Sequence, residues 1–124
     1  MQQLLFHEKW EKALSKEDRI LIEEIFHQSR GKEDLALQNI RVARNYQQDI
    51  LASVLIENRT GKRVSLPFTL LYYEKSCKVA EYYFADYDLD VPPYTSMPWT
   101  FIFPADHVLN EPNLSEWHLE LKKT

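Results

Sequence analysis

Three aspartates in alternating positions could bind a cation. Asp86, Asp88 and Asp90 repeat with the spacing at which the calcium loop of an EF-hand begins. That loop requires Gly at its sixth position and Glu at its twelfth, where this sequence has Val91 and Met97. The EF-hand is therefore excluded. A looser calcium site between loops is one interpretation of the three carboxylates, and solvated side chains at the end of a strand are the other.

Histidine and cysteine lack the spacing that metal binding or catalysis requires. The four histidines are His7, His27, His107 and His118, and none of them forms an H-x-H, H-x-x-x-H or H-E-x-x-H pair. We expect His27, His107 and His118 at the surface. The single cysteine, Cys77, lies in a predicted hairpin turn, with no identifiable His–Asn or His–Asp partnership to activate it. We therefore predict no metal, no cofactor and no enzymatic activity.

Aromatic residues are concentrated in the second half of the chain, where twelve of them follow residue 62. The pairs Tyr72–Tyr73 and Tyr82–Tyr83 occupy the two strands of one predicted hairpin. Because neighbouring residues on a strand point to opposite faces, each pair sends one ring inward and one outward. Outward tyrosines can form cross-strand packing, a protein-binding or dimer face, or a platform for sugars.

Four of these aromatic residues are our candidates for a binding surface: Tyr73, Tyr82, Tyr94 and Trp99. Tyr73 and Tyr82 come from the two hairpin pairs, and the strand register decides which member of each pair faces outward. Tyr94 lies in segment 86–98, which contains three prolines and which we expect to be an irregular connection. Trp99 begins the strand that we expect after it. Trp99 is equally a candidate for the core.

The composition excludes several classes of function. The chain has 124 residues, a length that suits one domain spanning 1–124. Its 15 basic and 19 acidic residues give a net charge of -4. Its basic residues are scattered, which argues against nucleic-acid binding. Gly31 and Gly61 are the two glycines of the sequence, too few or too far apart for the glycine-rich loops that cradle phosphates.

Three features predict a cytoplasmic location. The opening MQQLLFHEKW has no basic stretch followed by an apolar one, as a signal peptide would have. The longest apolar run, Ile50–Ile56, is too short to span a membrane. One cysteine cannot form an internal disulfide, which fits a reducing compartment.

The hydrophobic pattern predicts one helix followed by strands. Ser15 can cap a helix over 15–29, in which apolar residues recur at helical spacing. From residue 35 to 122 the period changes to two, and Asn58–Lys62 has the Asn and Gly of a turn with positive φ. We expect strands at 39–46, 50–57 (central), 64–66, 68–74, 78–85, 99–103 and 114–121. The predicted fold is mainly β: an Ig-like antiparallel β-sandwich of about seven strands with one N-terminal α-helix.

The order of these features resembles a known family. The segments FHEKWEKALSKED, LIENRTGKRVSL, PYTSMPWTFIF and LSEWHLEL, from about Leu4 to Leu121, are similar to the SLAP domain of Gram-positive bacteria, which is named from an S-layer assembly protein of the accessory Sec system. PYTSMPW is the most specific of them. The chain resembles a single-domain member, without the additional segments of the assembly protein.

The resemblance implies a cytoplasmic accessory protein that supports export of surface-layer or other envelope proteins through a dedicated secretion ATPase. It carries over no catalytic residues. We therefore expect a non-enzymatic protein-interaction module whose partners are components or clients of an accessory secretion system, with a homodimer as a further option. The alternative is a small-ligand domain that binds calcium or a saccharide through the Asp86–Asp90 loop and exposed aromatic residues.

Overall fold

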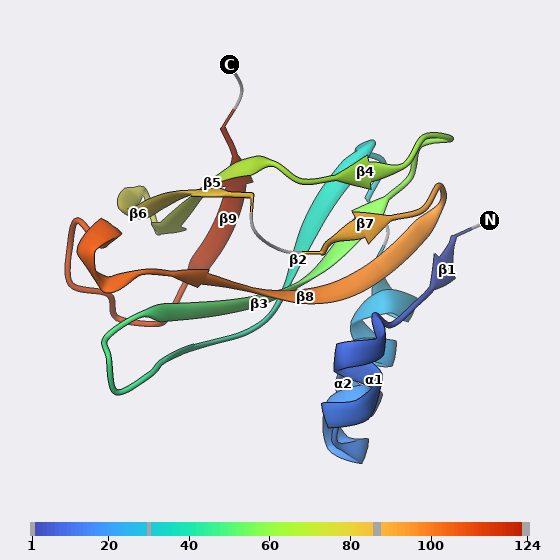
Figure 1. The fold of residues 1–124 in the computed structure, drawn as a ribbon, viewed down its shortest axis with the longest axis horizontal. Helices are drawn as coiled ribbons and strands as arrows, with labels where there is room; N and C mark the ends of the chain where they lie inside the picture. Colours follow the sequence, from blue (N-terminus) through green and yellow to red (C-terminus); the bar gives the residue numbers. More distant parts are fainter. Residues whose placement is uncertain (1, 30, 86–87, 123–124) are drawn as a thin grey trace.

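The computed structural model describes residues 2–29, 31–85 and 88–122, and it confirms a mostly β chain with 47% strand and 19% helix. Figure 1 shows the β-strands of two main sheets packed over one another, with a helical pair below the larger sheet. In chain order the elements are β1 Gln3–Leu4, α1 Glu8–Ala13, α2 Lys16–Gln28, β2 Leu35–Arg44, β3 Ile50–Asn58, β4 Val64–Ser65, β5 Phe68–Glu74, β6 Cys77–Phe84, β7 Asp90–Val91, β8 Thr95–Phe103, a 3₁₀ turn Ala105–His107 and β9 Trp117–Leu121.

The N-terminal region contains the predicted helix, which is α2, and two elements that the sequence pattern did not indicate, β1 and α1. Ser15 caps α2 by accepting a hydrogen bond from the Asp18 amide at 3.1 Å, as predicted. Before it, the imidazole of His7 accepts a hydrogen bond from the Lys9 amide and caps α1. The expectation of one helix was wrong because α1 has only six residues, too few for a helical period to be visible.

The larger sheet has the strand order β1-β8-β3-β2, so β3 is central, as its apolar sequence predicted. Its outer face is covered in part by the helices, where Ile22 of α2 and Leu55 of β3 are buried. In the described residues, no helix is both long and apolar enough to cross a membrane.

Pro98 lies inside β8 without breaking this sheet. The Ser96 carbonyl accepts a hydrogen bond from the Leu5 amide at 2.9 Å, so the backbone groups of Ser96 and, two residues on, of Pro98 point toward β1. Because β1 ends at Leu4, Pro98 loses no ladder bond at this edge-like position. The expectation of an irregular connection over 86–98 was therefore wrong from Thr95 onward, where β8 begins. It was also wrong at Asp90–Val91, which form β7.

The smaller sheet has the order β6-β5-β9, and β4 pairs with β7 in a separate two-stranded sheet. β5 has the predicted limits, and β6 differs from its prediction by one residue at each end. β9 starts three residues later than predicted, because Leu114 and Glu116 have φ values of 61° and 50°, which a strand does not allow.

The core lies between the two main sheets. Phe84 of β6 contacts Phe101 and Phe103 of β8, with ring centroids 5.0 and 5.1 Å apart, and Tyr72 of β5 lies 6.0 Å from Phe103. Edge-to-face and tilted contacts of this kind add to the large apolar area that aromatic rings bury. Most of the aromatic excess in the second half of the chain is therefore core.

A buried amide organises the turn that follows β3. The side-chain nitrogen of Asn58 donates to the carbonyls of Lys62, Val91 and Pro92, at 2.7, 3.1 and 3.0 Å. Its oxygen accepts from both the amide and the hydroxyl of Thr60. The expectation that Gly61 supplies a positive φ was wrong, because neither glycine has one. Hydrogen bonds of Asn58 shape this turn instead.

An ion pair between buried Glu57 and half-buried Arg59 adjoins this turn. Arg59 donates to the Glu57 carboxylate at 2.8 Å and to the Ser29 hydroxyl at 2.9 Å, and Ser29 in turn donates to Glu57 at 2.6 Å. These bonds tie the end of α2 to β3. A Cβ on Gly31 would lie 3.1 Å from the guanidinium of Arg59, so the missing side chain lets the chain pass close to it. α2 ends at Gln28, so this close approach, and not the end of the helix, accounts for a glycine at position 31.

Replacing Asn58 with Ala should destabilise the fold by about 2–4 kcal/mol, because three carbonyls and two donors would lose their partner in a buried site. Urea denaturation would measure the free energy of unfolding. The control is Asn110→Ala. Asn110 is exposed and its amide bonds one carbonyl, so the loss should stay below about 1 kcal/mol. Equal losses in the two variants would contradict the role assigned to Asn58.

Candidate interaction surface

The register of the small sheet decides which tyrosines face solvent. Tyr72 is buried in the core, and Tyr73 faces outward as predicted. On β6, Tyr82 pairs with the buried Leu70 and packs against the core, so Tyr83 is the outward tyrosine, with 59% of its surface exposed. The selection of Tyr82 as an outward residue was therefore wrong by one position, which on a strand reverses the face.

The other two aromatic candidates lie elsewhere. Trp99 is 6% exposed on the inner face of β8, where its ring lies 5.3 Å from that of His7. It is a core residue, the second of the two interpretations. Tyr94 is 48% exposed and precedes β8, with its amide donating to the Thr60 carbonyl at 3.1 Å. The four predicted residues therefore do not form one site.

The outward side chains of the small sheet form a continuous surface, which we call the outer face. From β6 across β5 to β9 they lie in three rows: Tyr83, Thr69 and Lys122; Glu81, Leu71 and Glu120; Lys78, Tyr73 and His118. Leu71 occupies the centre and the charged residues surround it. This arrangement of apolar and aromatic side chains within a polar rim is typical of transient protein interfaces.

Tyr73 and His118 form a stacked ring pair on the outer face. Their rings are stacked with centroids 5.4 Å apart and an interplanar angle of 7°. Glu120 lies two residues beyond His118 on the same face, and its carboxylate is 2.6 Å from His118 Nε2. His118, which the sequence indicated only as a surface histidine, is thus held by a ring on one side and a carboxylate on the other. The sequence signal for this pair is the spacing of two residues between His118 and Glu120, which places both side chains on one face of a strand.

A buried carboxylate positions β9 and hence His118. Glu74 accepts hydrogen bonds from the amides of Asn113 and Leu114, each at 2.8 Å, and from the hydroxyl of Tyr72 at 2.7 Å. Burial raises the pKa of Tyr72, with the bond to Glu74 as the second cause, so its hydroxyl stays protonated and donates. The loop that leads into β9 is therefore fixed to the end of β5.

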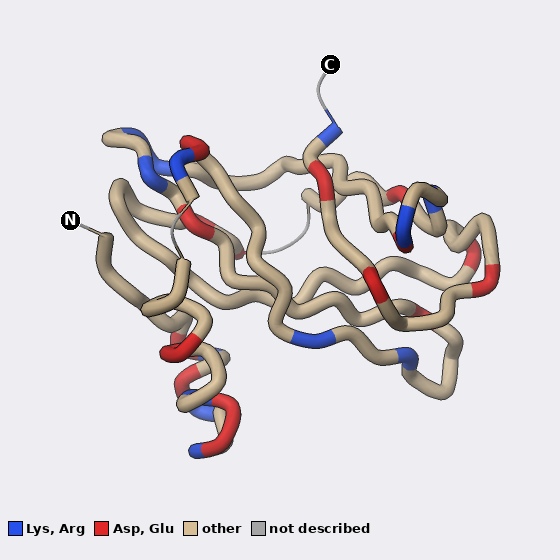
Figure 2. The backbone as a smooth tube through the Cα atoms, turned by 180° about the vertical axis from the view of Figure 1, so that it is seen from behind, with Lys and Arg blue, Asp and Glu red and all other residues tan. Residues whose placement is uncertain are grey.

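Charged residues on the outer face are paired. Glu81 accepts hydrogen bonds from Lys122 at 2.9 Å and from Lys78 at 3.0 Å. These two bonds hold the pKa of Glu81 below its usual range, and the bond from Lys122 has the larger effect. Figure 2 shows basic and acidic residues interspersed over the backbone, including the helical pair. The structure thus agrees with the scattered charge of the sequence.

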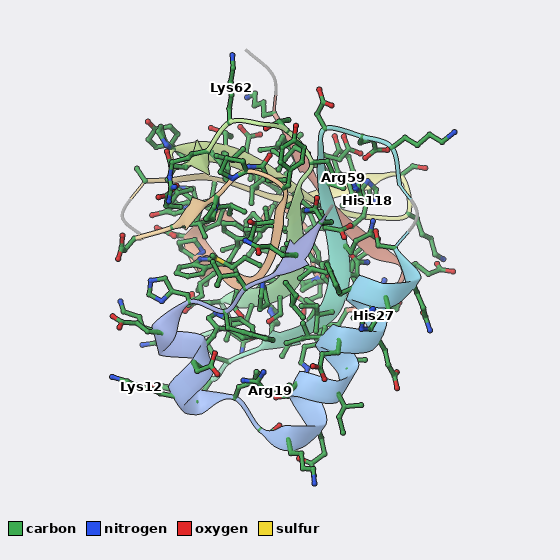
Figure 3. The ribbon with its side chains drawn as sticks, turned by 90° about the vertical axis from the view of Figure 1, so that its right-hand side faces the viewer. Lys12, Arg19, His27, Arg59, Lys62 and His118 are labelled. Carbon is green, nitrogen blue, oxygen red and sulfur yellow. The ribbon has the colours of Figure 1, made fainter. Side chains whose placement is uncertain are left out.

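A groove of about 530 Å³ adjoins the outer face at His118. Its lining comes from three elements: Ile25, Gln28 and Ser29 at the end of α2, Leu37, Gln38 and Asn39 of β2, and His118 of β9. At one end Asn39 Nδ2 donates to the Trp117 carbonyl at 2.5 Å and joins the two sheets. Figure 3 shows His118 and His27 on the same side of the molecule, above and along α2.

The aspartate loop has a different environment from a calcium site. Asp86 lies outside the described residues. Asp90 accepts hydrogen bonds from two nitrogens of Arg63, which raise the pKa of that guanidinium, and Asp88 lies 3.6 Å from His7 Nε2. Within 2–29, 31–85 and 88–122, no three His, Cys, Asp or Glu side chains are grouped as metal ligands. The two described carboxylates face separate cationic or histidine partners.

Cys77 is exposed, and the two groups described in contact with its thiol are not bases. The amide of Asn110 lies 3.6 Å from its Sγ, and the Lys78 carbonyl 3.8 Å. Neither group can remove a proton from a thiol. The geometry around Cys77 is that of a surface hairpin residue.

One comparison with known proteins decides the family. A family model described as the SLAP domain matches residues 4–123. The chain belongs to the SLAP domain family. The match covers nearly all of the chain, so the two sheets, the helical pair and the groove are all parts of a SLAP domain. Searches of the curated proteins and of the solved structures gave no significant match.

Titration of Glu81 would test the outer face of this SLAP domain. Its pKa should lie below the usual glutamate value of about 4.3, rise in Lys122→Met, and rise further when Lys78→Met is added. Because the pKa is lowered on folding, the pairing stabilises the fold above pH values near 4.3, and this contribution disappears as the pH falls through the folded pKa. Carbon-detected NMR would follow the carboxyl group.

The control for this titration is Lys62→Met, which removes an exposed lysine from the turn after β3. It should leave the pKa of Glu81 unchanged. A Glu81 pKa that is the same in the double variant and in the unaltered protein would show that the two lysines do not hold the carboxylate in solution.

Proposed function

We propose that this SLAP domain is a non-enzymatic protein-binding module that acts in the cytoplasm of a Gram-positive bacterium. Its partners are components or clients of an accessory secretion system that exports surface-layer or other envelope proteins. Membership of the SLAP family supports the export context. The outer face of the small sheet, with the Tyr73–His118 stack beside the groove, is the observation that carries the binding role.

The distribution of polar groups also favours binding over catalysis. The buried polar side chains with most hydrogen bonds are Asn58, Glu57 and Glu74, and each holds a turn or a loop in place. On the outer face, the side chains are aromatic rings, one central leucine and paired surface charges. Side chains of these types supply contact area and orientation to a protein partner.

Site-specific photocrosslinking in cytosol would identify the partner. A photoreactive phenylalanine at position 83 lies on the outer face, and the same residue at position 46 lies on the turn after β2, where Tyr46 is 90% exposed. We expect position 83, and not position 46, to crosslink an envelope-protein precursor or a component of the secretion machinery. Identical crosslinks from the two positions, or none from position 83, would contradict the proposal.

The double variant Tyr73→Ser with His118→Ser should weaken binding of the crosslinked partner by about tenfold or more, because central aromatic residues dominate interface energies. Tyr46→Ser is the matched control and should bind normally. Affinity would be measured with purified partner, after thermal melting has established that each variant folds. An affinity unaffected by the double variant would move the binding surface away from the outer face.

A further inference from the structure

β2 presents one unpaired backbone edge. The Asp34 carbonyl accepts a hydrogen bond from the Arg59 amide at 2.8 Å, so the backbone groups of Asp34 face β3. In an antiparallel ladder this direction alternates, so Ala36 and Gln38 also face β3. The N–H and C=O groups of the alternate residues Leu35, Leu37 and Asn39 therefore point away from β3. Leu37 and Asn39 also line the groove.

The facing strand does not satisfy this edge. β9 forms its ladder with β5 and not with β2. Across the groove, Asn39 reaches the Trp117 carbonyl with its side chain, while the described residues provide no backbone partner for the edge of Leu35–Asn39. An unpaired edge of this kind is a template for a further strand.

The shape of the groove selects an extended segment as the occupant. The end of α2, with Ile25 and Gln28, forms one wall, and His118 of β9 stands at the other. A second folded copy would have to bring its own sheet edge between these two walls. A single extended chain needs only about 5 Å of width beside a strand, so it is the narrower occupant.

We propose that this groove binds an extended segment of a partner polypeptide as an added strand beside β2. The proposal rests on the protein-binding function and specifies its mode. The β-bulge between Asn39 and Arg41 ends the regular edge, so pairing covers Leu35–Asn39, about 17 Å of extended chain. Alternate side chains of the segment then meet Ile25 on one side and His118 on the other.

A synthetic peptide tests the backbone pairing directly. The probe is an acetylated heptapeptide of alternating threonine and valine with a C-terminal lysine, measured by calorimetry against the full chain. Its counterpart carries N-methyl groups at three alternate residues, which removes the donors that face β2. We expect binding of the first peptide and at least about tenfold weaker binding of the second. Equal affinities, or no binding of the first at millimolar concentration, would overturn the proposal.

Two variants of one edge residue separate backbone pairing from side-chain contact. Leu37→Ala and Leu37→Pro both remove the leucine side chain, but only proline removes the edge N–H, and it spares the ladder to β3. Leu37→Ala should keep the peptide affinity within about threefold, and Leu37→Pro should lower it at least about tenfold. Equal affinity of the two folded variants would overturn the proposal.

Amide hydrogen exchange of the unaltered chain tests the same edge if Leu37→Pro does not fold. Saturating peptide should slow exchange of the amides of Leu35, Leu37 and Asn39 and leave that of Tyr46 unchanged. Unchanged exchange at the three edge amides would contradict the added strand. If the peptide binds but position 83 gives no crosslink in cytosol, the groove proposal stands and the export role is rejected. If position 83 gives the expected crosslink but the peptide does not bind, only the groove proposal is rejected.

Discussion

The buried polar cluster at the end of β3 is the constraint on which the other elements depend. Glu57, Asn58 and Arg59 are consecutive, yet they bind three different parts of the chain: the end of α2, the segment before β8 and the start of β2. A buried carboxylate and a buried amide are costly unless every polar atom has a partner. Because the partners come from distant segments, this requirement selects one arrangement of helix and sheets.

A second buried carboxylate fixes the opposite end of the sandwich. Glu74 binds the amides that precede β9, and so determines how β9 lies beside β5. Since side chains alternate with a period of two, this register places Tyr73 beside His118 on the outer face and Tyr72 beside Leu119 in the core. The register of the candidate interaction surface is therefore held by a carboxylate, Glu74, that is itself buried.

Much of the fold could be predicted from the sequence, and its failures have specific physical causes. The cap of Ser15, the apolar run of β3 and the limits of β5 are local signals, and they gave the correct elements. The strand through Pro98 depends on which neighbouring strand its backbone groups face, and the inward direction of Tyr82 depends on the register of β6 against β5. Neither can be read from the local pattern of residues. The stacking of His118 on Tyr73 depends on the register of β9 against β5, so the sequence indicated His118 only as a surface residue.

The open edge of β2 and the outer face are linked through β9. His118 stacks on Tyr73 on the outer face and also lines the groove, so an added strand beside β2 would lie against a histidine already held by Tyr73 and Glu120. A rigid ring at the rim loses less conformational entropy on binding than a free one. The bulge at Asn39 and the charged Arg41 and Arg44 that follow restrict pairing along β2, which limits aggregation through this edge. Among the edge strands of the described residues, β2 is the one whose unpaired backbone lies next to the stacked Tyr73–His118 pair through the groove.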